Sequence, residues 1–203
     1  MEKLTFVRLL SNEQVDFYKA IFHQEADFSY RAGVFEEEKE EANYHAKFRE
    51  RAVFYNATFE KRADFSQSPS SKRTFSLFHG EADYMLAKFH EIAIFSNTSA
   101  ISVGGDMQIS DYHSFNSGSR FLFAKFDGDV LFKWTRFNGK ADFSNAEFYE
   151  RAYFVENPIM ENMIFTHVFL NDQGQVTFNG DLSNISFANG DITRVRFGDT
   201  VGR

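Results

Sequence analysis

Residues 115–154 read FNSGSRFLFAKFDGDVLFKWTRFNGKADFSNAEFYERAYF, and this stretch decides the fold of the chain. Phe recurs in it at alternating steps of six and five residues. A small residue, such as Ala124, Ala141 or Ala146, stands two positions before most of these Phe residues. The pattern is a repeat with a unit of eleven residues, and such a repeat predicts a stacked solenoid.

Steps of five and six residues fit neither the 3.6 period of a helix nor the period of 2 of a long strand. A small or apolar residue, a polar residue and a Phe together fit a very short extended segment, in which the outer two side chains point inward. Two or three residues then turn the chain, and four such segments make a square coil of about 22 residues that rises about 4.8 Å. Because one coil cannot bury its inward face alone, the coils must stack.

Stacked coils predict a register in which residues 22 positions apart lie on one another. On the outside, this register places Arg120 over Asp142 and Lys125 over Glu147, as two pairs of opposite charge. On the inside it predicts three stacked pairs: Phe121 on Phe143, Phe126 on Phe148, and Phe132 on Phe154.

The repeat spans about residues 15–200, and it follows a segment, 1–14, that we expect to cap the first coil. Two stretches without the repeat, 36–41 (EEEKEE) and 66–73 (SQSPSSKR), are expected to be loops. The abrupt end at Arg203 suggests a fragment of a longer chain, or an end that another chain covers.

The spacing leaves the register open around 29–48 and 96–114. After Phe154, the inward positions are expected at Ile159, Phe165 and Leu170, which continue the steps of five and six.

Of the 203 residues, 27 are Phe, two are Pro and none is Cys, so the chain has no disulfide framework and no thiol nucleophile. The net charge of −7 argues against general nucleic-acid binding, which needs a basic stripe. The first residues, MEKLTFVRLLSNEQ, lack the apolar core of a signal peptide, and no apolar run reaches the roughly 20 residues of a membrane helix. We therefore expect a soluble, cytoplasmic protein.

Several units resemble the A-(D/N)-(L/F)-x-x unit of pentapeptide repeat proteins: Ala26-Asp-Phe28, Ala63-Asp-Phe65, Ala82-Asp-Tyr84 and Ala141-Asp-Phe143. The resemblance covers about residues 15–200 and implies a right-handed quadrilateral β-helix. The alternating steps of five and six are similar to those of the Phe-rich branch of this family. Members of that branch often carry further helical or membrane segments beyond the solenoid.

The six His residues show no metal-binding spacing such as HxxxH or HExxH. Three of them, His23, His79 and His90, directly follow an inward Phe, which predicts positions on outward turns. Surface turn residues are therefore a better interpretation than metal ligands, and the same holds for the remaining three, which are His45, His113 and His167.

Carboxylates at the middle position of a unit are expected to point outward. A general acid needs a buried, perturbed carboxyl in a cleft, and a convex rod with a filled core offers no cleft. The chain also lacks the GxSxG, Walker and GxGxxG motifs. We therefore expect no catalytic, cofactor-binding or metal-binding residues and no enzymatic activity. The middle-position carboxylates are Asp27, Asp64, Asp83 and Asp142.

Trp134 is the residue whose type and place most favour a contact with another molecule. It is expected on a turn, flanked by Lys133 and Arg136, and an exposed Trp beside cations is typical of interface hot spots. The alternative, which we prefer, is a ring lying flat on the rod's own surface.

The architecture favours a non-enzymatic interaction or scaffold module that binds another protein, with specificity in the loops at 36–41 and 66–73. The resemblance implies an alternative, because some pentapeptide repeat proteins mimic B-DNA and bind type II topoisomerases such as gyrase. A continuous acidic face would support that alternative, and the expected charge pairs along the rod argue against it. The open C-terminal coil also suggests a homodimer interface.

Overall fold

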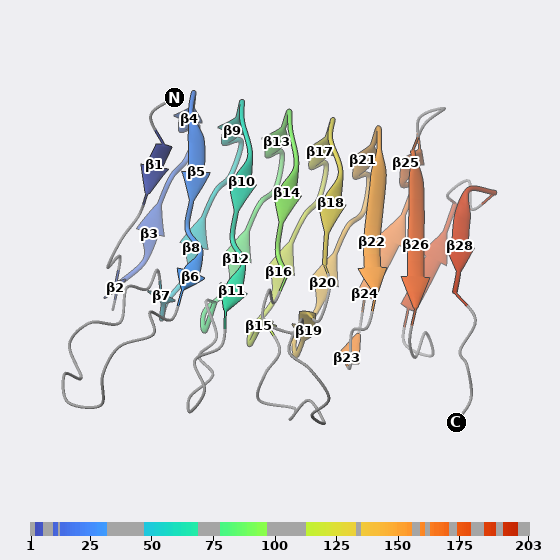
Figure 1. Ribbon diagram of the computed structural model, residues 1–203. Helices are drawn as coiled ribbons and strands as arrows, with labels where there is room; N and C mark the ends of the chain where they lie inside the picture. The colour runs from blue at the N-terminus through green and yellow to red at the C-terminus, as the bar shows by residue number, and fades with distance from the viewer. Residues whose placement is uncertain are drawn as a thin grey trace, which may run out of the picture.

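The computed structural model describes residues 3–5, 10–11, 13–31, 47–68, 78–96, 113–132, 135–155, 159–160, 163–170, 174–179, 185–189 and 193–198. Every regular element in this part of the chain is a β-strand, and every strand pairing is parallel. Figure 1 shows the strands stacked side by side into a rod that runs from the N-terminus to the C-terminus. This is a parallel β-helix, as the repeat predicts; the right-handed, four-sided geometry stays a prediction.

The strands lie in four rows, which we call rows A to D in the order in which the chain visits them, and most coils contribute one short strand to each row. Row A is an eight-stranded sheet. Its strands are β1 (Lys3–Thr5), β5 (Glu25–Asp27), β10 (Ala63–Asp64), β14 (Ala93–Ile94), β18 (Val130–Leu131), β22 (Arg151–Val155), β26 (Gln175–Asn179) and β28 (Val195–Phe197).

Row B contains a three-stranded and a two-stranded sheet, which are linked by bridges from Phe48 to Phe78 and from Phe78 to Phe115. Its strands are β2 (Leu10–Ser11), β7 (Lys47–Phe48), β15 (His113–Phe115), β19 (Thr135–Phe137) and β23 (Ile159–Met160).

Rows C and D are sheets of seven and six strands. Row C holds β3 (Val15–Asp16), β8 (Ala52–Val53), β12 (Ala82–Asp83), β16 (Ser119–Arg120), β20 (Ala141–Asp142), β24 (Met163–Thr166) and β27 (Ile185–Ala188). Row D holds β4 (Ile21–Phe22), β9 (Thr58–Phe59), β13 (Lys88–Phe89), β17 (Lys125–Phe126), β21 (Glu147–Phe148) and β25 (Phe169–Leu170).

The 22-residue register is confirmed in the middle of the rod, where Ser119 pairs with Ala141 and Phe126 with Phe148. All three predicted Phe pairs are stacked. The ring centroids are 4.6 Å apart for Phe121 and Phe143, 5.1 Å for Phe126 and Phe148, and 4.7 Å for Phe132 and Phe154.

Three successive coils are longer than 22 residues, and all three are lengthened at the same link, between row A and row B. Equivalent residues are 37, 30 and 37 positions apart across these coils. The expected loop at 36–41 lies outside the described residues. The expected loop at 66–73 begins later than predicted, because Gln67–Ser68 forms β11 and pairs with β6 (Tyr30–Arg31); residues 69–73 lie outside the described part.

The N-terminal segment already takes part in the rows: β1 pairs with β5 in the 22-residue register, and β2 pairs with β7. Its role as a cap stays a prediction. Near the other end, Phe137 pairs with Met160, so the inward register position falls one residue after the Ile159 expected from the spacing. The link from row A to row B has one residue more here and the link from row B to row C has one fewer, because Ala141 again pairs with Met163 at a spacing of 22 residues.

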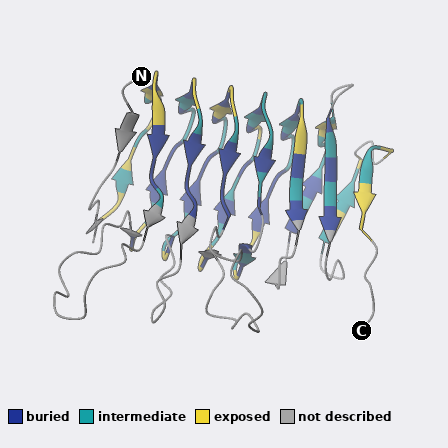
Figure 2. Cartoon of the chain, viewed as in Figure 1, coloured by how far each residue is buried: buried dark blue, intermediate teal, exposed yellow. Residues whose placement is uncertain are grey.

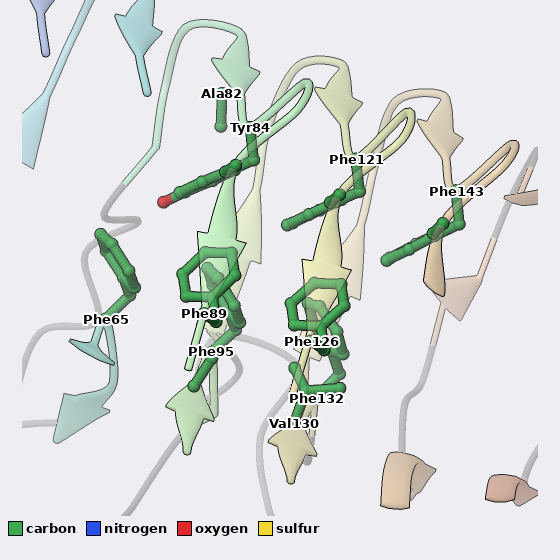
Figure 3. Close-up of a cluster of buried hydrophobic side chains, with 14 of the residues drawn as sticks. Phe65, Ala82, Tyr84, Phe89, Phe95, Phe121, Phe126, Val130, Phe132 and Phe143 are labelled. Carbon is green, nitrogen blue, oxygen red and sulfur yellow. The ribbon is translucent and has the colours of Figure 1, made fainter. Parts of the chain in front are cut away.

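The core is a bundle of aromatic columns (Figure 3). Within a column the rings stack nearly parallel, and between columns they meet edge to face, as Phe121 does with Phe132 at 5.6 Å and 85°. Most Ala residues that stand two positions before an inward ring are also buried, as are Val130, Met163 and Val176, and they leave room for the rings. Figure 2 shows this buried interior along the rod, with exposure increasing at β28. Each buried Phe contributes about 1.5–3 kcal/mol by area, so the aromatic columns hold the rod together.

Candidate interaction surface

The turn between rows C and D has the same backbone in every described coil. Its second residue has a positive φ of 51–60° although none of these residues is Gly, and the turn is closed by hydrogen bonds such as Ala124 N to Phe121 O (3.0 Å). The N–H of that residue also bonds to the next coil, as Asn145 donates to Thr166 O at 2.8 Å. The residues with positive φ are Lys19, Asn56, Leu86, Phe123, Asn145, His167 and Asn189.

Because each such turn presents two residues to the outside, stacked coils build two outward columns along the rod. In the first four coils these columns are largely apolar, whereas the following coils place Ser144, Thr166 and polar or small neighbours there. We call the apolar part the turn strip and define it as Tyr18, Tyr55, Met85, Leu86, Leu122 and Phe123.

The turn strip is open to solvent at both ends. Tyr18 is 53% exposed and Phe123 is 50% exposed, while the residues between them are half-buried. Tyr18 and Tyr55 stack with ring centroids 5.5 Å apart. Ile21, on the strand after the first turn, is another exposed apolar side chain of this coil.

A charged cluster supports the strip from the row C side. Asp83 lies between Arg51 of the coil before and Arg120 of the coil after, and both guanidinium groups pair with its Oδ2, Arg120 at 3.0 Å. Glu81 also pairs with Arg51 at 3.3 Å. Arg120 Nη2 further donates to the Met85 Sδ at 3.3 Å, so the cluster holds the side chain of a strip residue directly.

This cluster corrects the partners expected from the register. Arg120 lies beside Asp142 and Lys125 beside Glu147 along the strands, as predicted. The ion pairs, however, are made elsewhere: Arg120 with Asp83 and Glu81, and Lys125 with Asp127 at 3.2 Å. Long basic side chains reach the carboxylate that lies closest, which is set by side-chain direction as well as by register.

The middle-position carboxylates are buried, which corrects the expectation that they are solvent-facing. Each one points away from the Phe core but is covered by neighbouring coils, and its Oδ1 accepts a hydrogen bond from the backbone N–H two residues later. This is the Asx-turn pattern, which satisfies the carboxylate and the turn together. The bonds are Ser29 to Asp27 (2.8 Å), Ser66 to Asp64 (2.9 Å), Met85 to Asp83 (3.1 Å) and Ser144 to Asp142 (3.0 Å).

Asp142 shows the electrostatic consequence of this arrangement. Burial alone would raise the pKa of its carboxyl, but hydrogen bonds from Lys140 and Ser144 outweigh burial and hold that pKa below its ordinary value. The Lys140 Nζ lies 2.8 Å from Asp142 Oδ2. A charged carboxylate at this position therefore stabilises the turn, and nothing in its surroundings suits it to donate a proton.

His23, His79 and His90 are exposed, as predicted, on the turn after row D or row B. His23 Nδ1 lies 2.9 Å from Glu60 Oε2, and His90 Nδ1 lies 2.8 Å from Asp127 Oδ2. Among the described residues, no group of three or more His, Asp or Glu side chains could hold a metal ion.

The remaining predicted contact positions are only partly described. His167 is exposed at a C–D turn, and the backbone of His113 begins β15. The side chain of Arg136 is half-buried in β19. His45, Lys133 and Trp134 lie outside the described residues.

Comparisons with family models, with curated proteins and with solved structures find no match for this chain. Within the described residues, no helix is long and apolar enough to cross a membrane. The turn strip was not found from the sequence. The spacing of Phe residues predicts the inward columns, whereas the strip depends on which outward residues the lengthened coils bring together.

Proposed function

We propose that this chain is a non-enzymatic protein-interaction module of the pentapeptide repeat type, acting in the cytoplasm. The observation that supports this most directly is that three neighbouring coils are lengthened at the same link, the one from row A to row B. The strand pairings show that the extra residues of each of these coils come, along the chain, between its row A strand and its next row B position. Long connections between the elements of a rigid scaffold are typical of binding sites.

The core itself supports binding in preference to catalysis. The interior is filled by stacked aromatic rings, and many charged groups of the described surface are engaged in ion pairs or Asx turns. A filled solenoid offers a long regular surface, which suits recognition of another macromolecule.

The proposal is tested by restoring a short link. The segment 96–112 can be replaced by the two residues that join Phe132 to Thr135, because the flanking strands β14 and β15 stack on β18 and β19. We expect the variant to fold but to lose proteins that the wild type captures from extracts of the source organism. Unfolding curves provide the control for folding. Unchanged capture after all three links have been shortened would count against this proposal.

The alternative, a DNA mimic that binds gyrase, stays a proposal from the resemblance. The described surface alternates in sign along the rod, with Lys61 pairing Glu91 at 2.9 Å and Arg151 pairing Asp129 at 2.8 Å, and this favours the interaction module. Titration into a gyrase supercoiling assay separates the two. Inhibition that disappears in a Phe126→Ala variant supports the mimic, and no effect of the folded protein excludes it.

We also propose a homodimer through the C-terminal coil. Phe197 stacks on Phe178 at 6.2 Å yet remains 51% exposed, so one face of its ring lacks the cover that inner rings receive. Sedimentation analysis of wild type and Phe197→Ser tests this idea: a dimer that dissociates in the variant supports it, and a monomeric wild type rejects it.

A further inference from the structure

The turn strip contains two residues that the fold does not favour. Leu86 and Phe123 adopt φ values of 60° and 55°, where an L-residue with a bulky side chain is strained. Three other coils place Asn at the same position, where its short polar side chain tolerates this conformation. Phe123 is moreover half exposed, so core packing does not account for its ring. A bulky apolar residue that is exposed and has a strained positive φ is typical of a binding surface.

The strip is edged by positive charge on its row D side. Lys88 follows Leu86 by two residues, Lys125 follows Phe123 by two residues, and the strand pairing sets these two lysines beside each other. Lys125 is neutralised by Asp127 and also lies 4.4 Å from the Tyr149 ring. Lys88 is exposed and forms no ion pair within the described part of the chain. Lys125 also lies beside Glu147 along row D, so it already has two carboxylates nearby, and Lys88 is the cation of this edge that an added carboxylate can pair with.

The N-terminal end of the strip also carries an exposed lysine without an ion pair in the described residues. Lys19 is exposed, and its Nζ lies 4.9 Å from the centroid of the Tyr18 ring. In the described residues Lys19 forms no ion pair. Aromatic, Met and Arg side chains with a charged rim are the composition of protein interface cores.

We propose that the turn strip docks a protein segment that carries apolar side chains flanked by Asp or Glu. The apolar side chains would pack on Tyr55, Leu86 and Phe123, and the carboxylates would pair with Lys19 and Lys88. Four coils at a rise of about 4.8 Å give a strip about 15 Å long, which matches roughly ten residues of a helix or five of an extended segment. This inference deepens the proposed interaction function by naming a class of partner.

An anionic membrane surface is disfavoured by the charges next to the strip. The turn that follows row D carries Glu60, Glu91 and Asp127, and the whole chain has a net charge of −7. A lipid headgroup layer would meet these carboxylates and their cationic partners, such as Lys61, as well as the lysines of the strip, whereas a short protein segment can lie on the strip alone.

The test is selection of random peptides of about 12 residues, displayed on phage, against the full chain. Phe123→Asn and Leu86→Asn remove the apolar surface while keeping a residue that suits the turn. Lys88→Glu reverses the rim charge, and Lys88→Arg preserves it. His167→Asn is the matched control, because it lies at the same turn position outside the strip.

We expect the selected peptides to combine apolar residues with Asp or Glu. Their binding should weaken at least tenfold in Phe123→Asn and Lys88→Glu, weaken with added salt, and stay unchanged in Lys88→Arg and His167→Asn. Peptides without acidic residues, no enrichment, or equal binding to Phe123→Asn would overturn the inference.

The same variants also test whether the strip binds a membrane surface or a second copy of the chain in place of an acidic peptide. Binding to vesicles of phosphatidylserine and phosphatidylcholine that is lost in Phe123→Asn would assign the strip to a membrane and overturn the proposal. Concentration-dependent self-association lost in Phe123→Asn would assign it to a second copy, with the same consequence. The shortened-link experiment tests the lengthened links and does not depend on the turn strip. A negative result for the strip would therefore reject this inference without rejecting the general interaction function.

Discussion

At the scale of single residues, the position of an aromatic ring in a column decides its contribution. An inner ring such as Phe126 has a parallel neighbour on both sides, Phe89 at 5.0 Å and Phe148 at 5.1 Å. An outward ring such as Phe169 has half of its surface in solvent. Phe residues separated by a few positions in the chain therefore differ greatly in what they stabilise.

Replacement of Phe126 by Ala should lower the free energy of unfolding by about 3–5 kcal/mol, because the cavity is enclosed by rings that cannot collapse into it. Urea unfolding followed by circular dichroism measures the loss. Phe169→Ala is the control and should change stability far less. Equal effects of the two substitutions would mean that the inward assignment is wrong.

Tyr84 occupies a Phe position in a column and is fully buried. Its hydroxyl has no hydrogen-bond partner in the described structure, and burial raises the pKa of this phenol well above its ordinary value. An unsatisfied buried hydroxyl costs about 1–3 kcal/mol, so Tyr84→Phe should raise the free energy of unfolding by about 1 kcal/mol. Thermal unfolding of both proteins checks this, with Tyr55→Phe as a half-buried control; a loss of stability in Tyr84→Phe would indicate a bonded hydroxyl.

The lowered pKa of Asp142 makes a prediction about pH. Because the folded-state pKa lies below the ordinary 3.8, the ionised carboxylate stabilises the fold above pH 3.8, and this contribution is lost as the pH falls through the folded-state value. Asp142→Asn keeps an acceptor for the Ser144 N–H but removes the charge. We expect the variant to be less stable than wild type at neutral pH and the difference to shrink in acid below pH 3.8. A difference that is independent of pH would contradict this account.

At the scale of elements, the turn between rows C and D is the recurring unit with the most variable chemistry. The backbone is the same in all described coils, yet its second residue ranges from Asn to Phe. The row B to row C link is more restrictive: a Cβ added to Gly80 would lie 2.3 Å from the carbonyl carbon of Glu50, so only Gly fits there. The same link position holds Glu50 and Ser117 in neighbouring coils, so the need for Gly belongs to those coils in which the backbone of the preceding coil lies against it, such as Gly80 and Gly139.

The strain at Phe123 is tested by exchanging residue types at the positive-φ position between two of these turns. Phe123→Asn should stabilise the protein by about 1 kcal/mol, and Asn145→Leu should destabilise it by a similar amount, because a bulky residue costs about 1–2 kcal/mol in the left-handed region. Chemical unfolding measures both. If Phe123→Asn were destabilising, the ring would have a structural role, and the proposed docking surface would lose its main support.

At the scale of the whole molecule, stability is shared between neighbouring coils, because each coil contacts only the ones before and after it. Inner coils are covered on both sides, whereas Phe17 and Phe187, near the two ends of the described rod, are only partly buried. The rod should therefore open from its ends.

Amide hydrogen exchange measures this directly. We expect the slowest exchange in β12, β16 and β20 at the centre and faster exchange in β3 and β27. Mass spectrometry of proteolytic peptides resolves these segments. Uniform protection along the rod would show that the molecule unfolds as one cooperative unit, and the slowest exchange at one end would indicate additional cover there.

The sequence by itself determined the class of fold, the inward columns and the 22-residue register, because an inward Phe every five or six residues is a local pattern that the stacking must satisfy. It placed Phe121 on Phe143 and located His23 and His90 on outward turns. It misplaced the row B position near Ile159 by one residue, since local spacing cannot show that one link gains a residue and the next link loses one.

Only the tertiary structure decided what the outer surface contains. Coils of 22, 30 and 37 residues bring together residues whose separations no single period predicts, so Arg51, Asp83 and Arg120 meet in one cluster and Leu86 lies next to Phe123. The burial of Asp83 and Asp142 has the same origin, because neighbouring coils about 4.8 Å away cover side chains that point away from the core. Inward positions follow from the local spacing of the Phe residues. Which outward residues become neighbours depends on the length of each coil that separates them in the chain.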